Sequence, residues 1–485
     1  MEDSRVHILL KSEEDTPLCQ PLEVPLTIDP AQLQLLANEF IQTEESLPYS
    51  FYFGDKEIKG SLLDSVFTAT RGPATESTEH VLEIVCRPQA VFRVRPVTRC
   101  TSSLPGHGEA ITCVQFSHDG SQLASGSGDK SVRFWDLSTE TPQFSCQGHR
   151  HWILCVEWAP DGSRLVSGCK NGEIFVWDPH TGKSSPQSPL KGHKKWITGL
   201  VWEPLHLVRG DCCRHMASSS KDGDVRIWDV ILGKCQKVLA GHTAGVTCLK
   251  WGGEGLIYSA SQDRTIRVWR SEDGVLCRVL QGHGHWVNTM ALHTDYVMRC
   301  GSFDPVCMMK GKESLSMDGK TFHECIQQAA SRYAEAKGSG PERLVSGSDD
   351  FSLYLWQPAV DKKPMNRMTG HQQLVNQVRF SPDGRWIVSA SFDKSVKLWC
   401  GKTGNYITSF RGHVQAVYQV AWSSDSRLVV SGSADSTLKL FNASSGKLAG
   451  DLPGHADEVY AVDWSPRGDC VASGGKDKML KLWRY

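Results

Sequence analysis

Eight histidines recur along this 485-residue chain, and each of them directly follows a glycine. An acid or an amide comes after every one of these histidines, in five copies at a spacing of 22 residues. The pairs in chain order are His107/Asp129, His149/Asn171, His193/Asp222, His242/Asp263, His283/Asp350, His371/Asp393, His413/Asp435 and His455/Asp477. A histidine beside a carboxylate can act as a general acid or base, and the same side chains can equally form a buried hydrogen-bonded pair.

Repetition favours the structural role for these pairs. An active site is needed once, whereas a pair that holds a turn is needed in every copy of a repeated unit. Buried polar groups must find partners inside the protein, and a histidine and an acid can satisfy each other. We therefore predict structural hydrogen bonds, extended by a serine such as Ser389 and by a tryptophan, and no catalytic residue.

The segment from Gly370 to Trp399 shows the elements that must position such a pair. Two alternating stretches rich in Val, Ile and Phe flank a Ser-Pro-Asp-Gly turn, which predicts strands with one buried face. An aromatic residue follows each acid or amide by six positions: Trp135, Trp177, Trp228, Trp269, Trp356, Trp399, Phe441 and Trp483. Gly-His near the start and Trp-Asp near the end, with a period of roughly 40–45 residues, is typical of WD repeats. The sequence therefore predicts an all-β, eight-bladed WD-repeat β-propeller over residues 96–485.

Two departures from the repeat bear on how the ring is built. The last copy ends near the C-terminus without an outer strand, and residues 97–104 precede the first Gly-His without a blade of their own. We expect these residues to complete the last blade, which removes an exposed sheet edge. The fifth copy carries an insertion over about 298–342, with helical spacing from Phe322 to Tyr333. It is either a functional loop or a tolerated decoration.

Residues 1–95 lack the repeat and are predicted to form a separate α+β domain ending in a basic linker. Alternating patterns predict strands at 5–11, 22–28, 49–53 and 81–86, and a helix from Pro30 to Gln42 with Asp29 as its N-cap. A short helical turn is expected at 61–67. This order of elements is that of a ubiquitin-like β-grasp.

Charge is divided unequally between the two predicted parts. Residues 1–86 hold 16 acidic and 5 basic side chains, against 38 and 48 in the remainder. This fits two parts that meet different partners, or simply two ordinary solvated surfaces.

The 17 cysteines are odd in number and lack paired C-x-x-C spacing. They predict reduced thiols in the cytosol or nucleus and no zinc site. The chain shows no secretory signal and no apolar run long enough for a membrane span.

Two further sets of side chains could contact a partner. Trp152, Trp196 and Trp286 follow the Gly-His of their copies, beside Arg150, Lys194, Lys195, His151 and His285. They could bind protein or RNA, or each tryptophan could pack on a neighbouring blade. The second set lies two residues before the terminal aromatic and is expected to be structural: Arg133, Arg226, Arg267, Lys397, Lys439 and Lys481.

The ubiquitin-like head, the linker RPQAVFRVRPVT followed by RCTSSLPGH, and the eight repeats together resemble the Notchless family of ribosome-assembly factors. The resemblance covers essentially the whole chain. It implies a non-catalytic factor for the large (60S) subunit, resident in the nucleolus and nucleus. The propeller would dock on ribosomal proteins and rRNA of the pre-60S particle. A link to Notch signalling, through the Notch intracellular region, is also implied.

The resemblance implies one specific contact of the head. In the family, a glutamate just before the last head strand reaches the Mg²⁺ of the MIDAS domain of midasin, an AAA ATPase. The motif falls on Ser77-Thr78-Glu79, with Glu76 and Glu83 as competing positions. A hard cation with an open position takes a carboxylate oxygen, so this chain alone would bind no metal and need no cofactor. Without the resemblance, Glu79 would be an ordinary solvated acid.

The main alternative is a WD-repeat substrate receptor of a ubiquitin ligase, or a signalling scaffold. Such receptors often carry Trp-Asp-x-Arg, but none of the Trp-Asp dipeptides at Trp135, Trp177 and Trp228 has that arginine. The head also lacks a terminal Gly-Gly. No P-loop pattern occurs, so ATP would be hydrolysed by the partner. A hydrolase is a distant third possibility.

Overall fold

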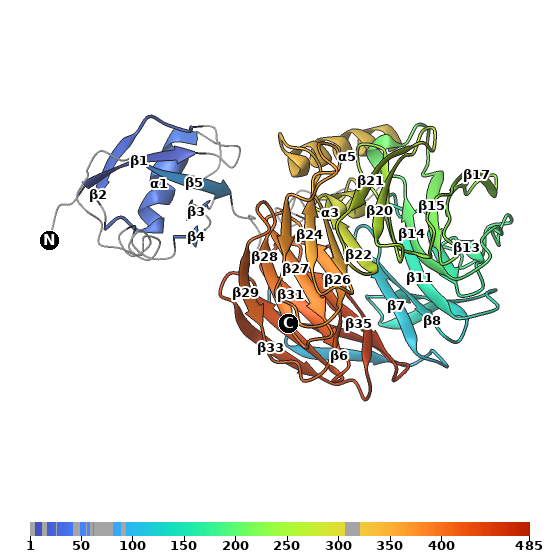
Figure 1. Cartoon of the computed structure of the whole chain (residues 1–485). Coiled ribbons are helices and arrows are strands. Elements are labelled where there is room, and N and C mark those ends of the chain that lie inside the picture. The colour runs from blue at the N-terminus through green and yellow to red at the C-terminus, as the bar shows by residue number, and fades with distance from the viewer. Residues whose placement is uncertain are drawn as a thin grey trace. The chain divides into compact units, whose positions relative to one another are not determined.

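The computed structural model describes residues 5–11, 17–25, 27–41, 49–54, 56–58, 62, 81–88, 94–305 and 321–485. The chain divides into two compact units, Met1–Arg93 and Val94–Tyr485 (Figure 1). No helix in the described ranges has the length and apolar character required to cross a membrane.

In its described residues, the first unit forms a mixed five-stranded sheet with a helix packed on it, which confirms the ubiquitin-like prediction. Its strand order is β2-β1-β5-β3-β4, with β1 and β5 parallel and the other pairs antiparallel. The elements are β1 Arg5–Lys11, β2 Leu22–Pro25, α1 Pro30–Ile41, β3 Tyr49–Phe53, β4 Lys56–Glu57 and β5 Leu82–Pro88. Alternate residues of β1 and β5 face α1, so that Ile8, Leu10, Leu33 and Ile84 are fully buried together.

The predicted helix start is confirmed. The Asp29 carboxylate accepts from the backbone N–H of Gln32 at 2.9 Å, and the Gln32 side chain accepts from the N–H of Asp29 at 3.3 Å. This reciprocal capping satisfies two donors that the first helical turn leaves free. The short strand β4 was not predicted; it follows a turn at Gly54, whose φ is +57°. The helical turn expected at 61–67 lies outside the described residues except for Leu62.

The second unit consists of eight antiparallel sheets whose innermost strands contact one another in a closed ring. The first three blades contain β7 Ile111–Phe116, β8 Gln122–Ser127, β9 Ser131–Asp136 and β10 Thr141–Gln147; β11 Ile153–Trp158, β12 Leu165–Cys169 and β13 Ile174–Trp177; and β14 Ile197–Trp202, β15 His215–Ser220, β16 Val225–Asp229 and β17 Lys234–Leu239. The fourth, fifth and sixth blades contain β18 Val246–Trp251, β19 Leu256–Ser261, β20 Thr265–Arg270 and β21 Leu276–Gln281; β22 Val287–Leu292, β23 Leu344–Ser348, β24 Leu353–Trp356 and β25 Asn366–Met368; and β26 Val375–Phe380, β27 Trp386–Ser391, β28 Val396–Cys400 and β29 Tyr406–Phe410. The seventh and eighth blades contain β30 Val417–Trp422, β31 Leu428–Ser433, β32 Thr437–Asn442 and β33 Lys447–Pro453; and β34 Val459–Trp464, β35 Val471–Gly475 and β36 Leu480–Arg484 with β6 Arg99–Leu104. This confirms the eight-bladed propeller.

The ring closes as the sequence predicts, because β6 pairs antiparallel with β36 in the last sheet. Leu104 lies opposite Leu480, and Arg99 lies opposite Arg484. In Figure 1 the blue β6 accordingly runs with the red strands of the C-terminal sheet. Pairing the two ends of the ring in one sheet covers the edge of β36 that would otherwise be free.

The propeller unit begins within the predicted basic linker. Val94 is buried, and its backbone N–H donates to Asp425 Oδ2 at 2.8 Å. The N–H of Thr98 donates to the carbonyl of Arg484 at 2.9 Å. The second half of the linker is therefore fastened to the seventh and eighth blades before β6 begins.

Each end of the propeller carries its own set of turns. One end, which we call the histidine rim, carries the turns between second and third strands and the Gly-His loops that begin at Gly106, Gly148, Gly192, Gly241, Gly282, Gly370, Gly412 and Gly454. The opposite end, which we call the insertion rim, carries the turns between first and second strands. The insertion of the fifth copy lies there because it connects β22 to β23.

The insertion begins with a short helix that the sequence pattern did not predict, α3 Asp295–Cys300. Its Arg299 forms a two-pronged ion pair with Asp463 on β34 and also donates to the carbonyl of Phe116 on β7 at 3.2 Å. Asp295 lies 2.8 Å from Lys250 Nζ on β18. Helix α3 therefore contacts innermost strands of the eighth, first and fourth blades and crosses the propeller axis at the insertion rim.

The predicted helix of the insertion is confirmed as α5 Phe322–Lys337, which begins with a Thr321/Glu324 capping box. Cys325 and Ala329 are buried in one cluster with Leu205 of the short 3-10 helix η1 Leu205–Leu207. Tyr333 stacks on His206 with ring centroids 4.3 Å apart. Between the described residues of the insertion, 306–320 lie outside the structural description. The described parts of the insertion are packed onto the propeller.

Candidate functional site

The predicted histidine–acid pairs lie at the histidine rim, in buried four-residue networks. In the sixth blade, His371 Nδ1 lies 2.7 Å from Asp393 Oδ2, and His371 Nε2 lies 2.8 Å from the Ser389 hydroxyl. Trp399 Nε1 donates to the same hydroxyl at 2.9 Å. Every member of the network is satisfied by another member, so the network stabilises the strand connections without presenting a reactive group.

The same hydrogen bond recurs in seven blades. The Nδ1–Oδ2 distances are 2.8 Å for His107/Asp129, 3.0 Å for His193/Asp222, 2.7 Å for His242/Asp263, 3.2 Å for His283/Asp350, 2.7 Å for His371/Asp393, 2.8 Å for His413/Asp435 and 2.8 Å for His455/Asp477. Burial alone would raise the pKa of Asp393, but hydrogen bonds from His371 and Ser395 outweigh it and lower that pKa below its usual range.

The second blade departs from the expected pairing. His149 bonds the Ser167 hydroxyl at 2.6 Å, but its buried Nδ1 has no hydrogen-bond partner, and the exposed Asn171 does not supply one. Phe175 packs its ring edge-on against His149 at 4.5 Å. Without a carboxylate to favour the cation, burial lowers the pKa of His149 to about 4. The amide at position 171 therefore does not replace the acid.

The row of cations two residues before the terminal aromatic lies behind the Gly-His loops. A Cβ on Gly106 would lie 2.9 Å from Arg133 Nη1, so the glycine leaves room for the arginine. Lys439 forms an ion pair with Asp451 at 3.1 Å, and Lys481 donates to the carbonyl of Gly454. These contacts within the rim support the structural role expected for Arg133, Lys439 and Lys481.

Two of the three predicted contact tryptophans come together at the rim. Trp152 and Trp196 are 45% and 41% exposed, and Lys170 Nζ lies 5.5 Å and 4.5 Å from their ring centroids. Lys221 Nζ lies 5.0 Å from the Trp196 centroid. With exposed Arg150, Lys194 and Lys195 these residues form what we call the tryptophan surface. A ring faced by ammonium groups and still open to solvent is suited to binding.

Trp286 is not part of that surface. It lies on the fifth blade, is 44% exposed, and has its ring centroid 5.3 Å from that of His285. Sequence reasoning missed Lys170 and Lys221, which lie in the turns between second and third strands. The feature of the sequence that could have identified these two lysines is their position directly before Asn171 and Asp222. These turns share the rim with the Gly-His loops only once the strands are paired.

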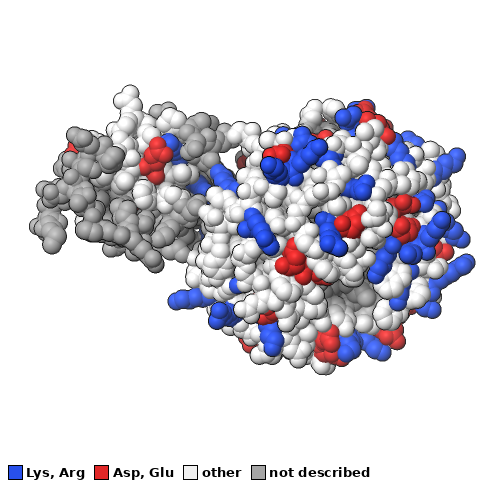
Figure 2. Space-filling view, viewed as in Figure 1, with Lys and Arg blue, Asp and Glu red and all other residues white. Residues whose placement is uncertain are grey.

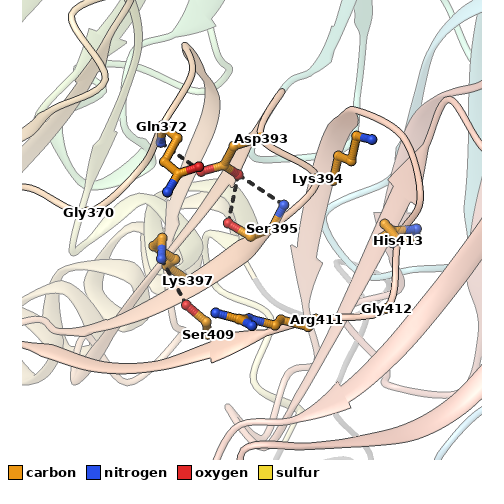
Figure 3. Close-up of a pocket in the computed structure, with 10 residues that line it drawn as sticks. All are labelled: Gly370, Gln372, Asp393, Lys394, Ser395, Lys397, Ser409, Arg411, Gly412 and His413. Atoms are coloured by element: carbon orange, nitrogen blue, oxygen red, sulfur yellow. Dashed lines mark hydrogen bonds between the residues drawn. The ribbon is translucent and has the colours of Figure 1, made fainter.

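Two hollows lie at this rim. One, of about 270 Å³, is lined by Leu154, Trp196, Ile197, Thr198, Lys221, Val246, Thr247 and Gln262. The other, of about 290 Å³, we call the sixth-blade hollow; its lining residues are Gly370, Gln372, Asp393, Lys394, Ser395, Lys397, Ser409, Arg411, Gly412 and His413 (Figure 3). Over the visible face of the propeller, Lys and Arg are more widespread than Asp and Glu (Figure 2).

In the head, the structure bears on one of the three candidate glutamates. Glu83 lies on β5, and its carboxylate is 2.7 Å from Lys11 Nζ on the neighbouring β1. Glu76 and Glu79 lie outside the described residues; β5 begins at Leu82, three positions after Glu79. Within the described ranges, no group of three His, Cys, Asp or Glu side chains is placed to hold a metal ion.

A ubiquitin-like domain followed by an eight-bladed WD propeller defines the class of protein. The family described as WD domain, G-beta repeat matches residues 98–136, 140–178, 184–229, 233–270, 362–400, 404–442 and 446–484. It leaves out the fifth blade, whose insertion interrupts the repeat. The family described as NLE (NUC135) domain matches residues 6–66.

Relatives identify the family more closely. The chain is 56% identical over 363 residues to Protein Notchless of Drosophila melanogaster, covering 75% of this chain and 72% of that one. It is 56% identical over 410 residues to the Notchless protein homolog of Arabidopsis thaliana, with coverages of 84% and 83%. The chain belongs to the Notchless family.

Two further similarities concern a yeast protein and a solved structure. Ribosome assembly protein 4 of Saccharomyces cerevisiae is 46% identical over 402 residues, covering 80% of this chain and 76% of that one. The crystal structure of the computationally designed protein Ika8 matches with a TM-score of 0.61 and 26% identity, covering 80% of this chain and all of that one.

Proposed function

We propose that this protein is a non-enzymatic assembly factor for the large (60S) ribosomal subunit, acting in the nucleolus and nucleus. The observation that supports this role is the 46% identity over 402 residues to Ribosome assembly protein 4 of yeast. The histidine networks support a structural role, because in the sixth blade His371, Asp393, Ser389 and Trp399 bond one another.

In this proposal the propeller docks on the precursor particle, on ribosomal proteins and rRNA, through the tryptophan surface. Half-exposed tryptophans beside exposed cations are typical of contact sites. The head binds the MIDAS domain of midasin, and the ATPase pulls on it to drive remodelling or release. A link to Notch signalling is part of the same proposal, supported by the names of the relatives; capture of the Notch intracellular region by the full chain tests it.

The carboxylate that we assign to the Mg²⁺ of the MIDAS domain is Glu79. Glu83 is the weaker candidate because Lys11 already holds it at 2.7 Å on the sheet surface. Removing Glu83 from that ion pair would cost part of the binding energy. Glu79 lies three positions before β5, near the place where the family motif has its glutamate, and a carboxylate oxygen is a ligand that Mg²⁺ prefers.

The test is binding of the full chain to the MIDAS domain, measured by calorimetry with Mg²⁺ and with EDTA. Wild type should bind only with Mg²⁺, and Glu79→Ala should abolish binding. Glu83→Ala is the matched control, because it removes the same charge from the same segment and should retain binding.

Equal binding by wild type and Glu79→Ala would remove Glu79 as the ligand and direct the assay to Glu76→Ala. No binding by the folded wild-type chain would refute the connection to the ATPase. A ubiquitin-ligase receptor or another scaffold would then be the better function.

A further inference from the structure

The sixth-blade hollow contains two cations, Lys394 and Arg411, that no acid in the described part of the chain neutralises. Lys394 and Arg411 are exposed, and their side chains form no ion pair or hydrogen bond with any residue in the described part of the chain. Lys397, two residues before Trp399, donates to the Ser409 hydroxyl at 2.9 Å. Three positive side chains and a hydroxyl therefore line one hollow of about 290 Å³.

One acid, Asp393, lines the hollow beside the three cations, and both of its oxygens accept hydrogen bonds from the rim. Asp393 Oδ2 accepts from His371 at 2.7 Å and from the N–H of Gln372 at 3.0 Å. Its Oδ1 accepts from the N–H and the hydroxyl of Ser395 at 3.0 Å and 2.7 Å. Both carboxylate oxygens are thus engaged with the rim itself.

A serine also lies opposite the equivalent cation in the first and eighth blades, where Ser145 faces Arg133 and Ser103 faces Lys481. The sixth blade differs from both by Arg411, where the first blade has Gln147 and the eighth has Pro105.

An acid lies beside the equivalent cation in two other blades. In the seventh blade the residue opposite Lys439 is Asp451, which neutralises it at 3.1 Å. In the third blade Asp224 lies 3.8 Å from Arg226. In the sixth blade, the residue opposite Lys397 is the uncharged Ser409. The hydroxyl can donate to an anion where an acid would repel it.

The side chains are also arranged for an oxyanion. Figure 3 shows the guanidinium of Arg411 directed toward Ser409 and Lys397, with the engaged Asp393 on the other side of the lysine. An arginine fork beside an ammonium and a hydroxyl is the donor set that phosphate oxygens take up. Because the hollow opens on the histidine rim, a ligand that extends beyond it can also reach the neighbouring blades.

We propose that the sixth-blade hollow binds a phosphate group of an RNA backbone. This rests on the proposed function, in which the propeller meets rRNA. Further cations on the same rim, Arg150, Lys170, Lys194, Lys195 and Lys221, suit a chain with many phosphates. A phosphopeptide carries few phosphate groups and would leave most of these cations without an anionic partner. The exposed rings of Trp152 and Trp196 add surfaces on which bases stack.

The test is fluorescence anisotropy of labelled single-stranded oligouridylate titrated with the full chain at several KCl concentrations. Arg411→Glu should weaken binding by about tenfold at low salt and reduce the salt slope by about one. Arg411→Lys should recover most of the affinity. The matched control is Lys447→Glu, which makes the same charge change at the start of β33 on the insertion rim and should retain the wild-type slope.

If Arg411→Glu and Lys447→Glu weakened RNA binding equally, the effect would come from the net charge of the protein alone, and the proposed site would be wrong. A phosphoserine peptide that binds wild type but not Arg411→Glu, with RNA binding unchanged, would replace RNA by a phosphoprotein. Absence of RNA binding by wild type at low salt would also overturn the inference. That outcome leaves the midasin assay untouched, because Glu79 lies in the other unit. If Arg411→Glu lowers the melting temperature of the protein, Arg411→Gln takes its place in the binding assay.

Discussion

At the scale of single residues, the second blade shows how one different residue changes a histidine network. Seven blades pair the histidine with aspartate, and in the second blade Asn171 leaves His149 Nδ1 buried without a partner. Glu173, in the same turn, is buried with Oε2 also unsatisfied. The first blade has Ser131 at that place, donating to Asp129 at 2.6 Å. The second blade therefore contains two unpaired polar atoms that its neighbours avoid.

The double change Asn171→Asp and Glu173→Ser should repair this network. It recreates the residues of the first blade and gives His149 a carboxylate partner, which should raise the free energy of unfolding by about 1 kcal/mol. Thermal denaturation at pH 7 measures the gain. Asn171→Asp alone is the informative control, because the new acid then lies near the buried Glu173 and should gain less.

The same site predicts a pH dependence. The pKa of His149 is about 4 in the folded protein, against about 6.5 when unfolded, so only the unfolded chain binds the proton between these values. Stability should therefore fall as pH drops from 6.5 toward 4, by about 2 kcal/mol from this residue at pH 5. The double variant should show a smaller loss between pH 7 and pH 5, and an unchanged loss would contradict the assignment.

At the scale of elements, the insertion connects blades that are not neighbours in the propeller. Helix α3 leaves the fifth blade and places Arg299 against Asp463 of the eighth, where both side chains are largely buried. Helix α5 then packs on η1 of the third blade. Blades that are far apart around the ring are thus joined through the insertion, in addition to the contacts between neighbours.

Arg299→Met should destabilise the propeller by about 3 kcal/mol, because it leaves the Asp463 carboxylate buried without its cation. The midpoint of urea denaturation measures this loss. Adding Asp463→Asn removes the stranded charge and should recover a large part of it. Additive losses from the two changes would show that the pair is not coupled.

At the scale of the whole molecule, the protein joins an acidic head to a basic ring through a short segment. If the head is pulled, the load passes through residues 94–98 before it reaches β6, the strand that closes the ring. The charge-assisted hydrogen bond from Val94 to Asp425 and the bond from Thr98 to Arg484 therefore protect the closure. Each unit has its own core.

Asp425→Ala should loosen this attachment, because Val94 loses its acceptor. Hydrogen exchange over residues 94–98 should accelerate roughly tenfold, in line with the loss of a hydrogen bond to a charged group. Asp383→Ala is the matched control: Asp383 holds the same turn in the sixth blade through Ser381 and Arg385 but forms no hydrogen bond or ion pair with the linker residues that the structure describes. Equal exchange in both variants would mean that the turn, and not the anchor, is responsible.

The sequence by itself determined the features that depend on local order. Spacing of Gly-His and Trp identified the blades, alternation placed most strands within a few residues, and Asp29 marked the start of α1. The missing outer strand of the last copy determined the ring closure. These predictions succeed because each repeat must bury the same face with the same period, so the same residue pattern recurs in every copy.

The tertiary structure alone decided the features that join distant residues. It placed Lys170 between Trp152 and Trp196, carried α3 across the axis, fastened Val94 to the seventh blade and left His149 without a partner. Nothing in the local pattern of Lys397, Ser409 and Arg411 shows that they share a hollow. Such contacts depend on how strands pair and how loops converge at a rim, and the period of a repeat carries no information about that convergence.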